Sequence, residues 1–193
     1  MERRNFLSLA WVAGAGLLLM GHSPYRQWHV YRKQRLIILT SAEDQPSFPL
    51  GEAVAEVLAA HLPESRAMVA RARDSVDIVK LLGSQQLDVA LLLADDAFQA
   101  FQGSGRFRDE GSLPLRTLAV FGTYLLVCRV DFSTEKAYRL ARTLAEHRSE
   151  LKPGTPGQGE SGALPSGSTL PFHPGALDFY EGRSLPRGEE KTR

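Results

Sequence analysis

The feature that most constrains this chain is a regular alternation of short apolar runs and amphipathic stretches between Arg35 and Gly103. Three runs, "RLIILTS", "RAMVARA" and "LDVALLLA", have the length and composition of buried strands. Three segments that follow them, "PLGEAVAEVLAAHL", "DSVDIVKLLGSQ" and "DDAFQAFQG", have apolar residues or end signals typical of helices. This order predicts an α/β sheet with parallel pairs and right-handed crossovers.

The second half of the chain is less regular. The stretch "LRTLAVFGTYLLVCRVD" is strand-like on both sides of Gly122, so it is either one long bent strand or two strands with a tight break. The next segment, "STEKAYRLARTLAEHRSEL", is an amphipathic helix with Ser133 as a candidate N-cap. We place the α/β lobe at residues 35–152.

The C-terminal part begins with an abrupt change of composition. Twelve of the nineteen residues in 153–171 are Gly, Pro or Ser, which indicates a flexible linker. Order resumes at 172–183, where Pro174 suits the first turn of a helix. We expect this helix to dock on the lobe through Phe172, Phe179 and Tyr180, with His173 as a capping or packing residue. Residues 184–193 are predicted to be a disordered tail.

The N-terminus carries a basic head and an apolar run over residues 6–20. A run of this length favours a signal peptide at 1–23, since a comfortable span needs about 20 apolar residues. The basic juxtamembrane segment 24–34 carries more positive charge than the head, which favours an uncleaved inner-membrane anchor instead. Arg3 and Arg4 resemble a twin-arginine export signal. The positive-inside rule would hold the basic segment in the cytoplasm, which conflicts with export. Our expectation is a periplasmic lobe, exported or anchored to the inner membrane by residues 6–20, a hydrophobic N-terminal helix.

Composition excludes several classes of function. The formal net charge of +1 gives no general argument for a nucleic-acid partner. The single cysteine, Cys128, lies in an apolar run and is interpreted as a core residue. No two histidines have i, i+3 or i, i+4 spacing, so we predict no metal site and no cofactor. No nucleophile, phosphate-loop or dinucleotide motif is present, and we predict that the protein is not an enzyme.

Two groups of charged residues are candidates for binding. Asp95 and Asp96 follow the third predicted strand, at the sheet edge where α/β proteins hold ligands, although acidic residues also complement a helix N-terminus. Arg66, Arg71 and Arg73 surround the second strand. They could pair with an anionic ligand or form a solvated edge.

Four blocks of the sequence together resemble the TAXI family of solute receptors, which serve tripartite ATP-independent periplasmic (TRAP) transporters. The blocks are "SFPLGEAVAEVL", "RDSVDIVKLLGSQQLDVALLLADDAFQAFQG", "YLLVCRVDFSTEKAYRLARTL" and "LPFHPGALDFYEG". They cover most of residues 36–182. The chain departs from the family pattern at Asp74, where Gly is usual before Ser75, and at Asp77, where Asn is usual.

The resemblance implies a type 2 periplasmic-binding-protein fold, here a single lobe with a mixed, mostly parallel sheet and flanking helices. It implies a small acidic solute, such as glutamate or a dicarboxylate, and a TRAP membrane subunit as partner. The residues expected at the ligand edge are Phe48, Gly51, Ser75 and Asp96. The family's second lobe has no counterpart between Gly103 and Asp131, so the alternative is a membrane-anchored interaction or regulatory module that no longer binds solute.

Overall fold

The computed structural model describes residues 35–151 and 170–184. The predicted signal peptide or anchor, the basic segment, residues 153–169 of the predicted linker and residues 185–193 of the tail lie outside the described residues. No helix in these two ranges is long and apolar enough to cross a membrane.

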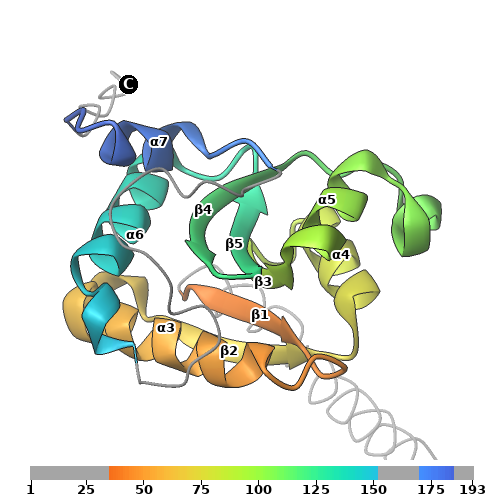
Figure 1. Cartoon of the computed structure of the whole chain (residues 1–193), viewed down its shortest axis with the longest axis horizontal. Coiled ribbons are helices and arrows are strands. Elements are labelled where there is room, and N and C mark those ends of the chain that lie inside the picture. The colour runs from red at the N-terminus through yellow and green to blue at the C-terminus, as the bar shows by residue number, and fades with distance from the viewer. Residues whose placement is uncertain (1–34, 152–169, 185–193) are drawn as a thin grey trace, which may run out of the picture. The chain divides into compact units, whose positions relative to one another are not determined.

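The described residues form an α/β fold around one five-stranded mixed sheet (Figure 1). The strand order is β2-β1-β3-β5-β4. The strands are β1 (Ile37–Ser41), β2 (Met68–Ala72), β3 (Val89–Leu93), β4 (Leu115–Phe121) and β5 (Tyr124–Arg129). The α-helices are α3 (Ser47–His61), α4 (Ser75–Gly83), α5 (Ala94–Gln102), α6 (Thr134–Glu146) and α7 (Pro174–Tyr180), and the 3-10 helices are η1 (Pro63–Ser65), η2 (Gly105–Glu110) and η3 (Arg148–Glu150).

The first half of the fold is the predicted strand and helix alternation. Strand β1 pairs in parallel with β2 on one side and with β3 on the other. Helix α4 begins where its sequence predicted, because the Asp74 side chain accepts a hydrogen bond from the Asp77 N–H. Gly51 lets α3 approach the sheet, since a Cβ there would lie 2.8 Å from the Thr40 Cγ2 atom and 2.9 Å from the Val69 Cγ2 atom.

The second half of the fold is an antiparallel hairpin. Gly122 has a φ of 59° and breaks the stretch into β4 and β5, which settles the alternative that the sequence left open. Strand β5 pairs with β3 in antiparallel fashion, and β4 pairs with β5 in the same sense. Two of the four strand pairs are therefore antiparallel, so the prediction of a mostly parallel sheet was wrong. The hairpin arises because a two-residue turn can join only antiparallel strands.

Helices cover both faces of the sheet. On one face α3, α6 and α7 bury a core that includes Leu50, Val54, Leu140 and Ala176. On the other face α4, α5 and η2 bury Ile78, Leu82, Ala97 and Phe107 against the same strands. The Cys128 side chain is buried in the first of these cores, as predicted, and burial raises the pKa of its thiol.

Residues 170–184 dock on the outer edge of the sheet, as the aromatic pattern predicted. The Thr117 N–H donates to the Pro171 carbonyl oxygen, and the His173 N–H donates to the Thr117 carbonyl oxygen, so the segment pairs with β4. The Tyr180 hydroxyl donates to the Leu118 carbonyl oxygen. His173 caps α7, because its Nδ1 atom accepts a hydrogen bond from the Gly175 N–H.

Candidate functional site

A cavity of about 280 Å³ lies at the carboxyl ends of β1 and β3. The chain leaves β1 for β2 on one side and then crosses to β3 on the other, so these two strands flank a topological switch point. Open α/β sheets bind ligands in the crevice at such a point. The cavity is lined by Ser41, Glu43, Asp44, Ser75, Leu91, Leu92, Leu93, Asp96 and Arg106.

The N-terminus of α4 contributes the most buried polar side chain of this lining. Ser75 is the first residue of α4 and is 3% exposed. Its Oγ atom has no hydrogen-bond partner among the described residues. A buried hydroxyl that lacks a partner costs about 1–3 kcal/mol. Such a group calls for a partner outside the protein, such as water or a ligand. Ser65 has a similar hydroxyl, but among the lining residues only Ser75 does.

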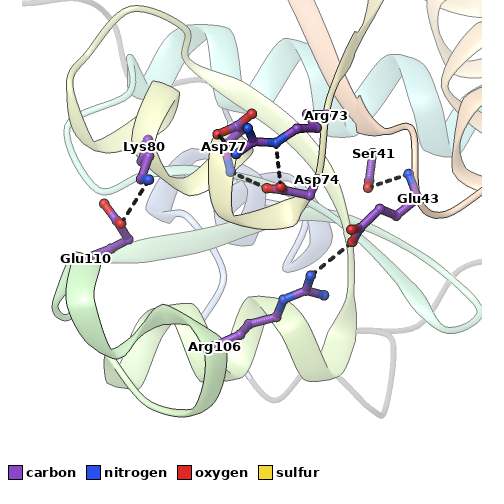
Figure 2. A network of polar contacts seen from close by, with 8 residues as sticks. All are labelled: Ser41, Glu43, Arg73, Asp74, Asp77, Lys80, Arg106 and Glu110. Carbon is purple, nitrogen blue, oxygen red and sulfur yellow. Dashed lines mark hydrogen bonds and ion pairs between the residues drawn. The ribbon is translucent and has the colours of Figure 1, made fainter.

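Two residues of the cavity lining, Glu43 after β1 and Arg106 in η2, form a charged pair (Figure 2). Arg106 of η2 donates a hydrogen bond of 2.9 Å to the Glu43 carboxylate, and its other terminal nitrogen lies 3.9 Å from the Asp96 carboxylate. The hydrogen bond to Glu43 raises the pKa of Arg106. The Glu43 N–H donates to the Ser41 hydroxyl, which ties this loop to the end of β1.

Asp44, another lining residue, is held by a tyrosine from the antiparallel half of the sheet. The buried Tyr124 hydroxyl donates a hydrogen bond of 2.9 Å to the Asp44 carboxylate. Burial, followed by this hydrogen bond to a carboxylate, raises the pKa of Tyr124. The lining therefore presents three carboxylates, those of Glu43, Asp44 and Asp96, and one guanidinium group.

A second set of charges surrounds the start of α4 (Figure 2). The Asp77 N–H donates to the Asp74 carboxylate and is the main cause of a lowered Asp74 pKa. Arg73 binds both the Asp74 and the Asp77 carboxylate at 2.9 and 3.0 Å. Lys80 pairs with Glu110 at 3.3 Å and so links α4 to η2. The Lys80–Glu110 pair holds α4 against η2, the short helix that carries Arg106.

The fold brings together two of the four residues predicted at the ligand edge. Ser75 and Asp96 line the same cavity, whereas Phe48 and Gly51 are absent from its lining. Phe48 is half-buried beneath the Arg71 guanidinium, whose carbon lies 3.8 Å from the ring centroid. Gly51 packs against Thr40 and Val69. The positions of these two residues are those of packing residues between α3 and the sheet.

Four polar lining residues were not predicted from the sequence: Ser41, Glu43, Asp44 and Arg106. Arg106 lies in the Gly-rich stretch "GSGRF", which leads from α5 into η2. Gly103 ends α5 in the left-handed region, and the chain then turns through Gly105, with a φ of 56°, into η2. This turn places Arg106 against Glu43, 63 residues earlier. No local pattern in the sequence indicated Arg106, whose neighbour Phe107 is a buried core residue.

The comparison with protein families supports the α/β assignment. Residues 38–124 match the NMT1-like family, a family of the periplasmic-binding-protein type. The match runs from β1 to the first residue of β5 and includes every residue that lines the cavity. No curated protein matches the chain. Residues 38–124 are thus similar to periplasmic solute-binding proteins, and the α/β fold is compatible with a single lobe of such a protein.

Proposed function

We propose that this protein is an extracytoplasmic solute-binding subunit of a TRAP-type transporter and that it binds its solute in the cavity between β1 and β3. One observation carries the proposal: the buried Ser75 hydroxyl, at the start of α4 and in the lining of that cavity, has no hydrogen-bond partner within residues 35–151 and 170–184. The cavity volume is near the lower end of the range of about 300–1,000 Å³ typical of ligand pockets. A solute of few heavy atoms fits this size.

The charges of the lining favour an amino acid such as glutamate over a dicarboxylate. The Ser75 hydroxyl and the Arg106 guanidinium are donors for a solute carboxylate. Asp96 and Asp44 are acceptors for an ammonium group, which a dicarboxylate lacks. Succinate would bring two negative charges to three carboxylates and one guanidinium, whereas glutamate brings two carboxylates and also an ammonium group that the acidic lining can accept.

The position of Asp74 favours a second candidate function, that of an interaction or regulatory module. Its carboxylate accepts from the Asp77 N–H and so takes up a donor of the α4 N-terminus that an anionic ligand could use. In this alternative the lobe docks on a membrane partner, and the cavity holds no solute. The two functions make opposite predictions for a binding experiment.

The experiment is isothermal titration calorimetry of the full chain with L-glutamate, and with succinate as a C4 dicarboxylate. We expect heat of binding with glutamate and less with succinate. Ser75→Ala and Arg106→Gln should both weaken glutamate binding, because each removes a donor to the solute carboxylate. Arg108→Gln is the matched control, since Arg108 is an exposed arginine of the same short helix and does not line the cavity.

Folding of each variant is checked by circular dichroism before titration. Absence of heat with both solutes from a folded chain would contradict solute binding and favour the interaction module. Equal weakening by Arg108→Gln would show that the charge of η2, rather than the cavity, governs binding. Co-purification of the full chain with a TRAP membrane subunit from membranes tests the partner separately.

A further inference from the structure

A second cluster of chemically active side chains lies far from the cavity in the sequence and on different elements. His61 is the last residue of α3, His147 is the C-cap of α6, and Glu150 ends η3. The two imidazole rings are stacked, with centroids 3.4 Å apart and an interplanar angle of 8°. His61 and Glu150 are 89 residues apart, so only the fold brings the three side chains together.

The carboxylate of Glu150 bridges the two histidines. Its Oε2 atom lies 2.8 Å from the His61 Nε2 atom, and its Oε1 atom lies 2.8 Å from the His147 Nδ1 atom. These hydrogen bonds lower the pKa of Glu150, with that to His61 contributing most. One nitrogen from each ring and one carboxylate oxygen lie within 4.8 Å of one another.

These distances are close to those of a zinc site. Tetrahedral Zn²⁺ holds nitrogen and oxygen ligands at about 2.0–2.2 Å, which separates the ligand atoms from each other by about 3.3–3.5 Å. The two 2.8 Å hydrogen bonds, which use different oxygens of Glu150, would have to widen by about half an ångström, and the three ligand atoms, now within 4.8 Å of one another, would have to gather around one ion. One ring must also rotate out of the stack, because parallel rings cannot both direct an in-plane lone pair at one ion. Both histidine side chains are 30% exposed and have solvent on one side.

The surroundings favour a cation. Both histidines lie at helix C-termini, where the partial negative charge of the helix dipole stabilises positive charge. The nearby guanidinium groups are already paired, Arg139 with Glu135 and Glu64, and Arg142 with Glu146. Their repulsion of an incoming ion is therefore offset by carboxylates.

We propose that His61, His147 and Glu150 form a binding site for a divalent transition-metal ion, with Zn²⁺ as the ion that two imidazoles and one carboxylate suit best. The fourth position is open to water, since the histidines border a groove of about 540 Å³. A bound ion would join the ends of α3 and α6. This site is independent of the proposed solute cavity and does not rest on it.

The test measures zinc binding by the full chain, by competition with a chromophoric chelator, and the shift in melting temperature on adding ZnCl₂. We expect one ion per chain and a melting temperature that rises with zinc, because a ligand that binds only the folded state stabilises it. His61→Gln/His147→Gln should weaken binding by more than the roughly 10–100-fold that loss of an outer-shell partner causes. Glu150→Gln should weaken binding less, because it keeps the shape and removes only the anionic ligand.

The matched control is His22→Gln/His29→Gln, which removes two histidines of the same chain from outside the proposed site. We expect this control to bind zinc as the wild type does. Replacement of zinc by Co²⁺ should give the visible absorption of a tetrahedral ion, and the first double variant should lose it. The proposal is wrong if the wild type binds no zinc, if all variants bind it equally, or if only the control loses it. If the first double variant does not fold, Glu150→Gln and the single His147→Gln variant decide the question by the same measurements.

Discussion

The starts of two helices in this protein, α4 and α7, are capped alike and packed differently. At α4 the Asp74 side chain caps the helix, but the hydroxyl of the next residue, Ser75, is buried beside a cavity and has no partner in the described part of the chain. At α7 the cap is His173, which is 1% exposed and satisfied on both its ring and its backbone N–H. The comparison shows that capping alone does not identify a site. At the start of α7 the His173 side chain is buried and hydrogen-bonded, which stabilises the fold. At the start of α4 the Ser75 hydroxyl remains available to a ligand.

The largest effect is expected from Gly175→Ala, at the buried start of α7. A Cβ atom on Gly175 would collide with the Thr134 backbone carbonyl at the start of α6. Backbone cannot move aside as a side chain can, so α7 should shift away from α6 at a cost of about 3 kcal/mol. Urea denaturation measures the free energy of unfolding. Gly83→Ala is the control, because its Cβ would make only an ordinary contact, 3.7 Å from Leu113. Equal free energies of unfolding for Gly175→Ala and Gly83→Ala would contradict the close packing of α7 against α6.

A smaller loss is expected from Gly51→Ala, on the parallel side of the sheet. The new Cβ atom would meet methyl groups of Thr40 and Val69 at 2.8 and 2.9 Å, and these side chains can give way in part. We expect a loss of about 1–2 kcal/mol in unfolding free energy and an unchanged solute affinity by calorimetry. Lost solute binding at full stability would instead support the ligand role that the family resemblance implied for Gly51.

The elements of the fold were largely predictable, because local signals determine them. Ser133 was predicted as an N-cap and accepts the expected backbone hydrogen bond, as Asp74 does at the start of α4. The direction of β4 and β5 was not predictable from propensity, since "LRTLAVFGTYLLVCR" is apolar on both sides of Gly122 and either alternative fits that pattern. Only the pairing of β5 with β3 determines that the second half of the sheet is antiparallel.

The candidate site was predictable in part. Asp96 follows a predicted strand, and ligands bind at the carboxyl ends of strands in open α/β sheets, so the sequence indicated this residue. Ser75 was expected only from the family resemblance. Glu43 and Arg106 come together across 63 residues, and no spacing rule connects a loop after the first strand with a turn after α5. The same limit hid the pairing of His61 with Glu150.

The third prediction sharpens the contrast between a satisfied and an unsatisfied serine. Ser75→Ala removes a buried hydroxyl that has no partner and should raise the free energy of unfolding by about 1 kcal/mol. Ser133→Ala is the matched variant at the start of α6, where the hydroxyl accepts from the Lys136 N–H, and it should lower the same quantity by about 1 kcal/mol. Opposite signs in urea denaturation would confirm the comparison. A loss of stability in both would indicate that Ser75 supports the fold.

The smallest effect is expected from His173→Asn, read as a change in pH dependence. Burial, with a further contribution from the charge of Arg116, lowers the pKa of His173 from its ordinary 6.5, although hydrogen bonds with the Phe132 and Val130 backbone oppose the shift. As pH falls below about 6.5, the unfolded chain takes up a proton that the folded chain does not, so stability decreases.

Asparagine keeps an acceptor at this N-cap and removes the titrating group. The urea midpoint of the wild type should therefore fall more between about pH 7.5 and about pH 5.5 than that of the variant. Asp74 and Glu150 do not contribute in this range, because their lowered pKa values cost stability only below their ordinary 3.8 and 4.5. Identical pH profiles of the wild type and the variant would mean that the His173 ring accepts a proton while the chain stays folded. The start of α7 would then be as accessible to solvent as the cavity beside the start of α4, and the contrast between the two helix starts would fail.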